Sequence, residues 1–486
     1  MSDSTGVVVP LEGARRRTSA LGRAVVADAL RGVDRQGAVR AEAEPDWRKG
    51  YGAHFHRLVE AGLGSADDAR RIAEDGLASL SARMRWIGDD GVETGLRERL
   101  ATSAPETPPL STETVVGAGA PETELSVPYR GRRLAGDDLH RHLEGWVERG
   151  IVEPDVAEAV DAVQSNPHWL RLPGRTAVVL GATSEMGPLR SLLRWGAAVA
   201  AVDLPRPDLW RRLVPDVRRY AGTLRVPVQS EDSREIEERA GADLLHDLPR
   251  IADWIESIEG PLVLGNYVYA DGATNLRLSA ATDALTERLL RRRDDVALAY
   301  LATPTDVFVV PREAVEHSQE RFQGRRARLL SAGVRMLSLQ SLYRPGYTSG
   351  AGEPGITDSV VAQQGPNYLL AKRIHRRRAT SARAAGTQVA FGVAPPTRTR
   401  SVVKNRALAA AYSGAHRFGV EVFEPATSNT LMAALLVYDL CAGIPAREHP
   451  WQDEAAHAAH GGLWRTGYDP RSVLGVAAVT GLAARH

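Results

Sequence analysis

The pattern of apolar and polar positions changes near residue 175. Before that point, the segments 53–63, 66–87 and 137–164 mix apolar and charged residues at roughly helical spacing. After it, short apolar runs alternate with helical stretches, which is typical of a parallel sheet with crossover helices. The predicted strands cover 176–180, 199–202, 224–228, 262–268, 296–301, 334–338 and 388–392. The predicted helices between them cover 188–195, 244–256, 280–292, 312–331 and 367–384.

These elements predict an α/β fold with a doubly wound parallel sheet, a helical N-terminal region and a mixed, mainly helical C-terminal cap. The segment 101–128 is rich in Pro, Thr, Gly, Ala and Glu, which favours a linker or long loop. The predicted parts are a helical region over 1–100, this linker over 101–128, a helical segment over 129–170, the α/β domain over 171–430 and the cap over 431–486.

Composition places the chain among ordinary globular proteins. Its 486 residues are 43% hydrophobic and 25% charged, with a net charge of +1, so we expect no nucleic-acid partner. The single cysteine, Cys441, forms no internal disulfide, which suits a reducing cytosol. The N-terminus lacks the pattern of a signal peptide, and the apolar stretches fall short of the ~20 residues of a membrane helix. Histidine pairs lack a third ligand at metal-site spacing. We therefore expect a soluble, cytoplasmic protein without a membrane partner or metal.

The segment 176–204 predicts a nucleotide site. Gly181 follows an apolar strand and allows a tight turn, Gly187 lets the backbone approach a pyrophosphate, and Pro188 suits the first turn of the following helix. Asp203 ends the second strand, where a carboxylate accepts hydrogen bonds from the adenosine ribose and repels a 2′-phosphate. The predicted cofactor-binding residues here are Gly181, Thr183, Ser184, Glu185, Met186, Gly187 and Asp203.

The cofactor favoured by Asp203 is NAD(H), while Arg206 and Arg211 nearby keep NADP(H) open. Glu185 stands where the usual three-glycine pattern has its middle glycine. An ordinary strand, turn and helix within another α/β fold is the competing interpretation.

A tyrosine and a lysine four residues apart form the candidate catalytic pair. Only three of the 61 basic residues are lysine, and one of them, Lys372, follows Tyr368 at the spacing that places both on one face of a helix. A compact ammonium there lowers the pKa of the phenol, whereas a guanidinium is larger and held to a planar fork. A core-facing tyrosine beside a solvated lysine is the alternative.

The sequence GPNYLLAK at 365–372 resembles the active-site motif of the short-chain dehydrogenase/reductases (SDRs), and GATSEMG at 181–187 resembles their phosphate loop. The resemblance covers about 172–430 and implies an NAD(P)-binding Rossmann domain. It implies that Tyr368 is the general acid–base and that Lys372 also bonds the cofactor ribose. It further implies a homo-oligomer, although the N-terminal region could cover the usual interface.

The resemblance also implies a serine that orients the substrate oxygen, about a dozen residues before the tyrosine. Gly355 occupies that spacing, so Ser341 is favoured, followed by Ser338, with Ser359 as an alternative in a loop. The Pro-containing loop after the last strand would contact the nicotinamide. The predicted cofactor-binding residues of this loop are Pro395, Thr397 and Thr399. The catalytic asparagine of the family is unassigned, with Asn266 and Asn275 as neighbours of an apolar strand.

The leading hypothesis is an NAD(P)-dependent oxidoreductase that interconverts a carbonyl and an alcohol on a small-molecule substrate by hydride transfer. Tyr368, Lys372 and Ser341 would carry the catalysis. The alternatives are a non-catalytic NAD(P)-binding sensor or scaffold, and an epimerase or dehydratase of the same fold that retains NAD.

Overall fold

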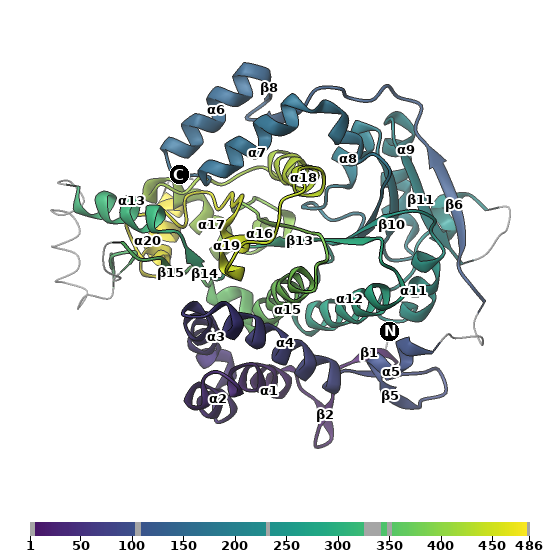
Figure 1. Ribbon diagram of the computed structural model, residues 1–486, viewed down its shortest axis with the longest axis horizontal. Coiled ribbons are helices and arrows are strands. Elements are labelled where there is room, and N and C mark those ends of the chain that lie inside the picture. Colours follow the sequence, from purple (N-terminus) through teal and green to yellow (C-terminus); the bar gives the residue numbers. More distant parts are fainter. Residues whose placement is uncertain (1–4, 103–107, 230–233, 325–341, 348–351, 484–486) are drawn as a thin grey trace.

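A seven-stranded sheet forms the centre of the molecule. The computed structural model describes residues 5–102, 108–229, 234–324, 342–347 and 352–483 (Figure 1). Six strands are parallel and lie in the order β16-β13-β12-β9-β10-β11, with β6 added antiparallel beside β11. The parallel strands are β9 (Thr176–Leu180), β10 (Ala198–Val202), β11 (Thr223–Val228), β12 (Leu262–Asn266), β13 (Val296–Ala302) and β16 (Val389–Val393). This is the doubly wound order of a Rossmann fold, so the predicted fold class is confirmed.

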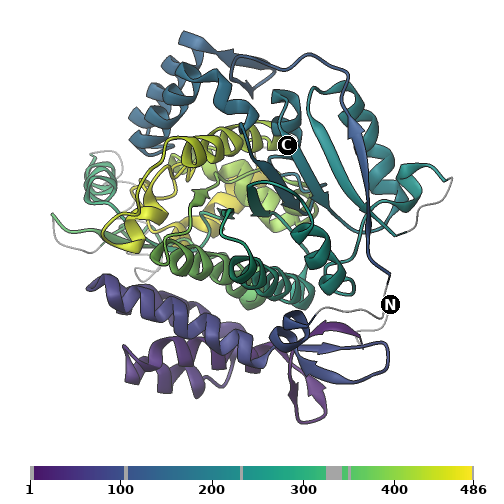
Figure 2. The same cartoon turned by 45° about the vertical axis from the view of Figure 1, so that its right-hand side comes forward.

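Each central strand divides its side chains between two cores, because successive side chains point to opposite faces. Val178 and Leu180 of β9 join the core on one side, while Ala177 and Val179 join the core on the other. Figure 2 shows helices on both faces of the sheet. One face carries α8 (Leu189–Trp195), α9 (Pro207–Arg219) and α18 (Pro425–Cys441); the other carries α11 (Leu248–Glu256), α12 (Gly272–Arg292) and α15 (Gly365–Ala384).

The segment predicted as a linker contains a strand of the main sheet. Ser111–Val116 form β6, which pairs antiparallel with β11 over its whole length. The β-branched run of this strand buries Val115 and leaves Val116 exposed, as expected for the edge of a sheet. A hairpin of β7 (Ser126–Tyr129) and β8 (Arg132–Ala135) follows, and α6 (Gly136–Glu148) and α7 (Pro154–Ser165) lead into β9.

The N-terminal helices pack as an extra layer beneath α12 and α15 (Figure 1). The backbone N–H of Val7 donates to the Leu245 carbonyl (2.8 Å), and Arg277 Nε donates to the Val7 carbonyl (2.6 Å). The layer contains β1 (Gly6–Val8), α1 (Thr18–Arg31), α2 (Arg35–Glu42), α3 (Trp47–Leu63), α4 (Ala66–Arg83), β4 (Arg85–Ile87), β5 (Glu93–Gly95) and α5 (Leu96–Ala101). The hydrogen bonds and the contacts with α12 and α15 attach this layer directly to the Rossmann domain.

The elements after β13 enclose one end of the sheet. A two-stranded ladder joins β14 (Val307–Val310) to β15 (Gly355–Asp358), away from the main sheet. The predicted strand 334–338, together with Ser338 and Ser341, lies outside the described residues. The remaining helices include α13 (Arg312–Gln323), α16 (Arg400–Lys404), α17 (Arg406–Gly414), α19 (Pro450–Ala455) and α20 (Pro470–Ala483).

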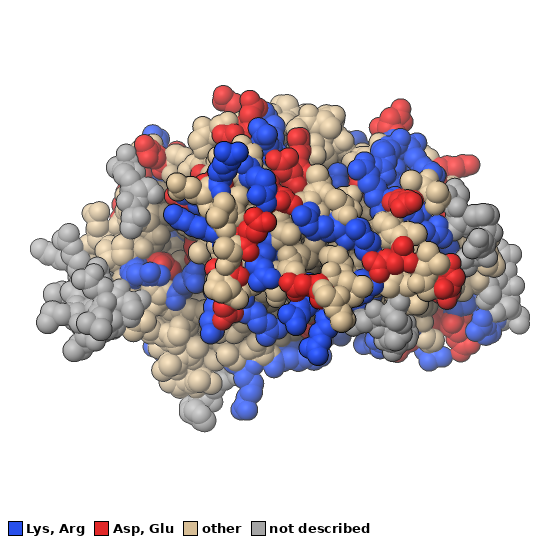
Figure 3. Space-filling model, turned by 90° about the horizontal axis from the view of Figure 1, so that it is seen from below, with Lys and Arg blue, Asp and Glu red and all other residues tan. Residues whose placement is uncertain are grey.

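Charged side chains of both signs are interspersed over the face formed by the N-terminal layer, as Figure 3 shows. This distribution agrees with the net charge of +1. Over the described ranges, the helices are too short or too polar to cross a membrane.

A buried carboxylate fixes the position of α15. Asp306, 1% exposed, accepts hydrogen bonds from Arg373 Nη2 (2.7 Å) and Arg376 Nη1 (2.8 Å), both on α15. Arg376 also pairs with Glu454 on α19 (2.5 Å). Burial alone would raise the pKa of Asp306, but the two guanidiniums outweigh it and hold that pKa below its ordinary value. The pairs tie α15 to the segment between β13 and β14.

Replacing Asp306 with Asn tests this network. The change leaves the Arg373 and Arg376 guanidiniums buried without their carboxylate, so we expect the free energy of unfolding to fall by about 3–5 kcal/mol. Urea denaturation followed by circular dichroism measures the change. Asp67→Asn, at a carboxylate that is 91% exposed, is the matched control and should be nearly neutral. A loss below about 1 kcal/mol for Asp306→Asn would contradict the structural role given to this carboxylate.

Candidate active site

The turn after β9 requires glycine at its first position. Gly181 has φ +82°, and a Cβ there would lie 2.9 Å from the backbone nitrogen of Val268. Gly187 is buried, and a Cβ there would make ordinary van der Waals contacts with the Ser184 carbonyl at 3.5 Å and with Tyr267 Cβ at 3.6 Å. The helix begins at Leu189, one residue after the predicted start. The loop therefore has a tight turn at Gly181, half-buried residues over 183–186 and a buried glycine at its end.

Asp203 holds the loop from the end of β10. Its Oδ2 accepts hydrogen bonds from the backbone N–H and the hydroxyl of Thr183, both at 2.8 Å. Its Oδ1 accepts from the Leu204 N–H (2.8 Å). The structure thus brings Asp203 and Thr183 together as predicted residues of one site. The predicted bond from the ribose to Asp203 stays a prediction.

Glu185 connects the loop to the C-terminal part of the chain. Its carboxylate accepts from the backbone N–H of Arg400 (2.8 Å) and pairs with Arg400 Nε (3.3 Å). Its carbonyl accepts from Asn429 Nδ2 on α18 (3.2 Å). The residue in place of the middle glycine is therefore charge-paired and fastens the start of α16 over the loop.

Tyr368 and Lys372 share the face of α15 that lies toward β13. Lys372 Nζ is 6.0 Å from the centroid of the Tyr368 ring and donates to the Leu301 carbonyl of β13 (3.1 Å). Burial lowers the pKa of Lys372 to about 8. The tyrosine and the lysine thus face each other at the carboxyl end of a central strand, which is where open α/β sheets bind ligands.

Thr303 contacts the tyrosine and was missed by the sequence analysis. It follows β13 directly, and its side chain lies close enough to Tyr368 to lower the pKa of the phenol. Burial raises the pKa of Tyr368 to about 12, and Lys372 is not among the groups that shift it, so the predicted lowering of the phenol pKa by the lysine is wrong. The Thr303 and Thr305 hydroxyls are 2.8 Å apart, and Thr305 donates to Gln364 Oε1 (2.9 Å). A row of hydroxyls therefore leads from the phenol to the loop before α15.

The reason for the omission is the choice of strand. Residues 334–338 were predicted as the strand before the tyrosine helix, but within the described residues β13 precedes α15 in the parallel sheet. The feature of the sequence that could have identified Thr303 is its position just after the strand predicted at 296–301. Ser341 lies outside the described residues, and Ser359 Oγ lies 3.4 Å from Thr357 Oγ1.

The predicted nicotinamide loop is internally bonded. The buried Thr397 hydroxyl donates to the Pro395 carbonyl (2.8 Å) and bonds Ser428 Oγ (2.6 Å). Thr399 Oγ1 bonds Ser401 Oγ (2.9 Å). These contacts order the loop after β16, and contact with a nicotinamide stays a prediction.

The two candidate asparagines are both buried and hydrogen-bonded. Asn266 Nδ2 lies 2.6 Å from the Thr282 hydroxyl and 2.9 Å from His375 Nε2. Asn275 Oδ1 accepts from the Ala270 N–H (3.3 Å). These bonds connect β12 to α12 and α15, so both asparagines have a structural role.

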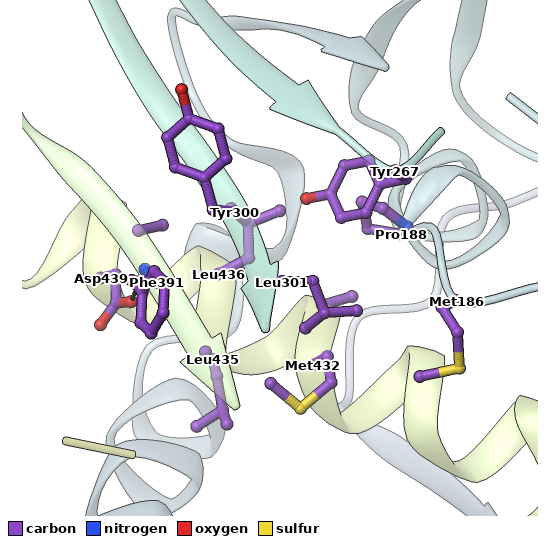
Figure 4. Close-up of a pocket in the computed structure, with 13 residues that line it drawn as sticks. Met186, Pro188, Tyr267, Tyr300, Leu301, Phe391, Met432, Leu435, Leu436 and Asp439 are labelled. Atoms are coloured by element: carbon purple, nitrogen blue, oxygen red, sulfur yellow. Dashed lines mark hydrogen bonds between the residues drawn. The ribbon is translucent and has the colours of Figure 1, made fainter. Parts of the chain in front are cut away.

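Two pockets lie near the carboxyl end of the sheet. The first, of about 330 Å³, lies between the sheet and α18, and Figure 4 shows Met186 and Tyr267 at one side of it and Phe391 at the other. The second, of about 650 Å³ including its open mouth, is formed by the loop at 359–361, α17 and α20. Its walls are mainly apolar and include Val361, Pro396, Tyr412, Phe418, Val420 and Leu474.

The larger pocket is linked to the surroundings of Tyr368 through Thr305, which lines it and whose hydroxyl lies 2.8 Å from that of Thr303. Burial raises the pKa of Tyr412, which also lines this pocket, and the charge of Tyr368 raises that pKa further. Thr305 and Ser359 are polar residues of the pocket wall. An apolar molecule in this pocket would therefore lie beside the row of hydroxyls. The described residues contain no group of three or more His, Cys, Asp or Glu that could hold a metal ion.

Comparison with known proteins gives distant structural similarities. No protein-family model and no curated protein matches the chain. An A1-type ketoreductase structure is 14% identical, with 59% of this chain and 54% of that chain covered and a TM-score of 0.32. A structure of A-type ketoreductases from a modular polyketide synthase is 15% identical, with 59% of this chain and 54% of that chain covered and a TM-score of 0.31. A thiolation-reductase di-domain from an archaeal non-ribosomal peptide synthetase is 10% identical, with 54% of this chain and 66% of that chain covered and a TM-score of 0.27. The chain thus spans little more than half of the ketoreductase chains.

The titration of Lys372 is directly measurable, because the chain has only three lysines. Reductive ¹³C-methylation gives each lysine its own NMR signal, and Lys372→Arg identifies the signal of Lys372 by its loss. We expect this signal to titrate with a midpoint of about 8, since burial disfavours the ammonium. A midpoint near the ordinary lysine pKa of about 10.4 would contradict the burial of this group.

Proposed function

We propose that the protein is an NAD(P)-dependent oxidoreductase that interconverts a carbonyl and an alcohol. The observation that carries the proposal is the convergence of Tyr368, Lys372 and Thr303 at the carboxyl end of β13. The Thr303 side chain lies near the phenol of Tyr368, and Lys372 Nζ lies 6.0 Å from the centroid of its ring. The apolar pocket beside it supplies room for the substrate.

The residues of the loop after β9 fit a dinucleotide. The backbone of this loop would hold the diphosphate, and Asp203 stands at the end of the second strand, where an adenosine ribose binds in this fold. The carboxylate of Asp203 favours NAD(H), while NADP(H) stays open. Lys372 would bond the nicotinamide ribose, as the resemblance to SDRs implies.

When bound, the reduced cofactor supplies the hydride for the carbonyl carbon. Tyr368 donates its phenolic proton to the carbonyl oxygen, and Thr303 orients the same oxygen by a hydrogen bond. In the oxidative direction, the phenolate removes the proton of the alcohol.

The larger pocket defines the class of substrate. Its walls are mainly aliphatic and aromatic, and its hydroxyls belong to Thr305 and Ser359. We therefore propose a ketone, aldehyde or secondary alcohol on an apolar body of small or medium size.

The Tyr368→Phe variant tests the role of the phenol. A screen of apolar carbonyl compounds, followed by NADH and NADPH consumption, first identifies a substrate. In the variant, kcat should fall by about 10²–10⁴-fold, because the proton donor is lost. The Kd for the cofactor, measured by calorimetry, should stay within about twofold, since the ring is retained. Undiminished turnover would contradict the proposal, and cofactor binding without turnover of any compound would favour an NAD(P)-binding sensor.

A pair of variants tests which hydroxyl orients the substrate. Thr303→Val keeps the shape of the side chain and removes its hydroxyl, so kcat should fall by about tenfold or more through loss of a hydrogen bond made in the transition state. Ser359→Ala removes the hydroxyl that lines the pocket without contacting Tyr368, and kcat should stay within about threefold. A larger fall in kcat for Ser359→Ala than for Thr303→Val would instead assign the orienting role to Ser359.

A further inference from the structure

A third pocket lies on the far side of α15, between this helix, the N-terminal layer and α19. It measures about 550 Å³, part of which is open to solvent. Its apolar walls come from α3, α4 and the start of α19. They include Leu58, Val59, Leu63, Ile72 and Trp451. Because this pocket is separate from the residues proposed for catalysis, it needs its own explanation.

Arg377 contributes a buried cation to this pocket. It is 4% exposed, and its Nε and both Nη atoms are buried without a hydrogen-bond partner. Its guanidinium lies against α4 at Gly76, where a Cβ would collide with Nη1. A buried ion without a partner is costly, since it loses its hydration and gains no counter-charge.

The neighbouring charges do not compensate Arg377. Arg373 and Arg376 also line the pocket, and they use the carboxylates of Asp306 and Glu454. Three guanidiniums therefore face two carboxylates, which leaves one positive charge. Burial and the two neighbouring arginines lower the pKa of Arg377 to about 9, so the group is still cationic at neutral pH.

The other polar groups of the pocket are neutral. Thr380 carries a hydroxyl, and His449 Nε2 bonds the Gly62 carbonyl (3.1 Å) while its Nδ1 accepts from the Trp451 N–H (3.3 Å). Burial lowers the pKa of His449, which favours the uncharged ring. The surplus charge of the site is therefore that of Arg377.

We propose that this pocket binds a monocarboxylate with an apolar body. The carboxylate would accept the fork of Arg377 donors, for which its planar geometry is matched, and the apolar body would pack against the walls from α3, α4 and α19. A single negative charge balances the single surplus positive charge, whereas a phosphate dianion exceeds it. This site does not depend on the proposed reductase activity, so either can fail without the other.

Calorimetric titration of the full chain with octanoate, 1-octanol and inorganic phosphate tests the proposal. Octanoate should bind saturably with one site per chain, and 1-octanol, which has the same chain length without the charge, should bind at least about tenfold more weakly. Phosphate should bind more weakly than octanoate. No saturable binding of octanoate at millimolar concentration, equal binding of 1-octanol, or tighter binding of phosphate would overturn the proposal.

Variants then assign the site. Arg377→Met keeps the length of the side chain and removes the charge, so octanoate affinity should fall about tenfold or more. The ligand-free thermal midpoint of this variant should equal or exceed that of the wild type, because an unpaired buried charge is removed. Arg71→Met, at an exposed arginine of α4, is the matched control and should leave octanoate affinity unchanged. Equal octanoate affinity in Arg377→Met, or a midpoint lower by several degrees, would overturn the proposal.

Discussion

The buried pairing of Asp306 with α15 is the interaction on which the site depends. Asp306 follows Thr303 by three residues, so one short segment after β13 both contacts Tyr368 and holds the arginines of its helix. The ion pairs fix the rotation of α15 about its axis. With that rotation fixed, Tyr368 and Lys372, which precede Arg376 along the same stripe of the helix at spacings of eight and four residues, point toward the end of β13. The geometry of the tyrosine is thus set by charges one to two turns further along the helix.

The use of arginine and lysine on α15 follows from what each cation can do. Arg376 and Arg378 form forked pairs with Glu454 and Asp283, and both keep their charge when buried. Lys372 meets only a carbonyl oxygen, and burial lowers its pKa to about 8. A permanent planar charge suits a structural ion pair, while a compact group near its titration range suits proton transfer. The use of lysine at residue 372, in a chain that otherwise favours arginine, therefore has a physical reason.

Local patterns predicted most of the fold and part of the site. Six parallel strands and the turn at Gly181 each depend on residues close in sequence, and the structure has them where they were predicted. Tyr368 and Lys372 share one face of α15, while their catalytic role stays a prediction. The strand β6 escaped prediction because its pairing with β11 joins segments about a hundred residues apart. The partners of Asp306 are similarly distant, and composition alone gives no sign of them. Thr303 was overlooked because the orienting hydroxyl was sought after the strand predicted at 334–338, which lies outside the described residues, and not after β13.

Glu185 is the main departure from the usual phosphate loop, and its surroundings remove most of the electrostatic objection. A free carboxylate beside a diphosphate would repel it strongly in a partly buried site. Here the carboxylate is paired with Arg400, so the local net charge is close to zero. The same contact draws the loop after β16 toward the loop after β9, and both loops border the carboxyl ends of the strands. A glycine at this position would leave Arg400 without its carboxylate partner. The substitution of the middle glycine is therefore compatible with a dinucleotide site, provided that Arg400 stays with it.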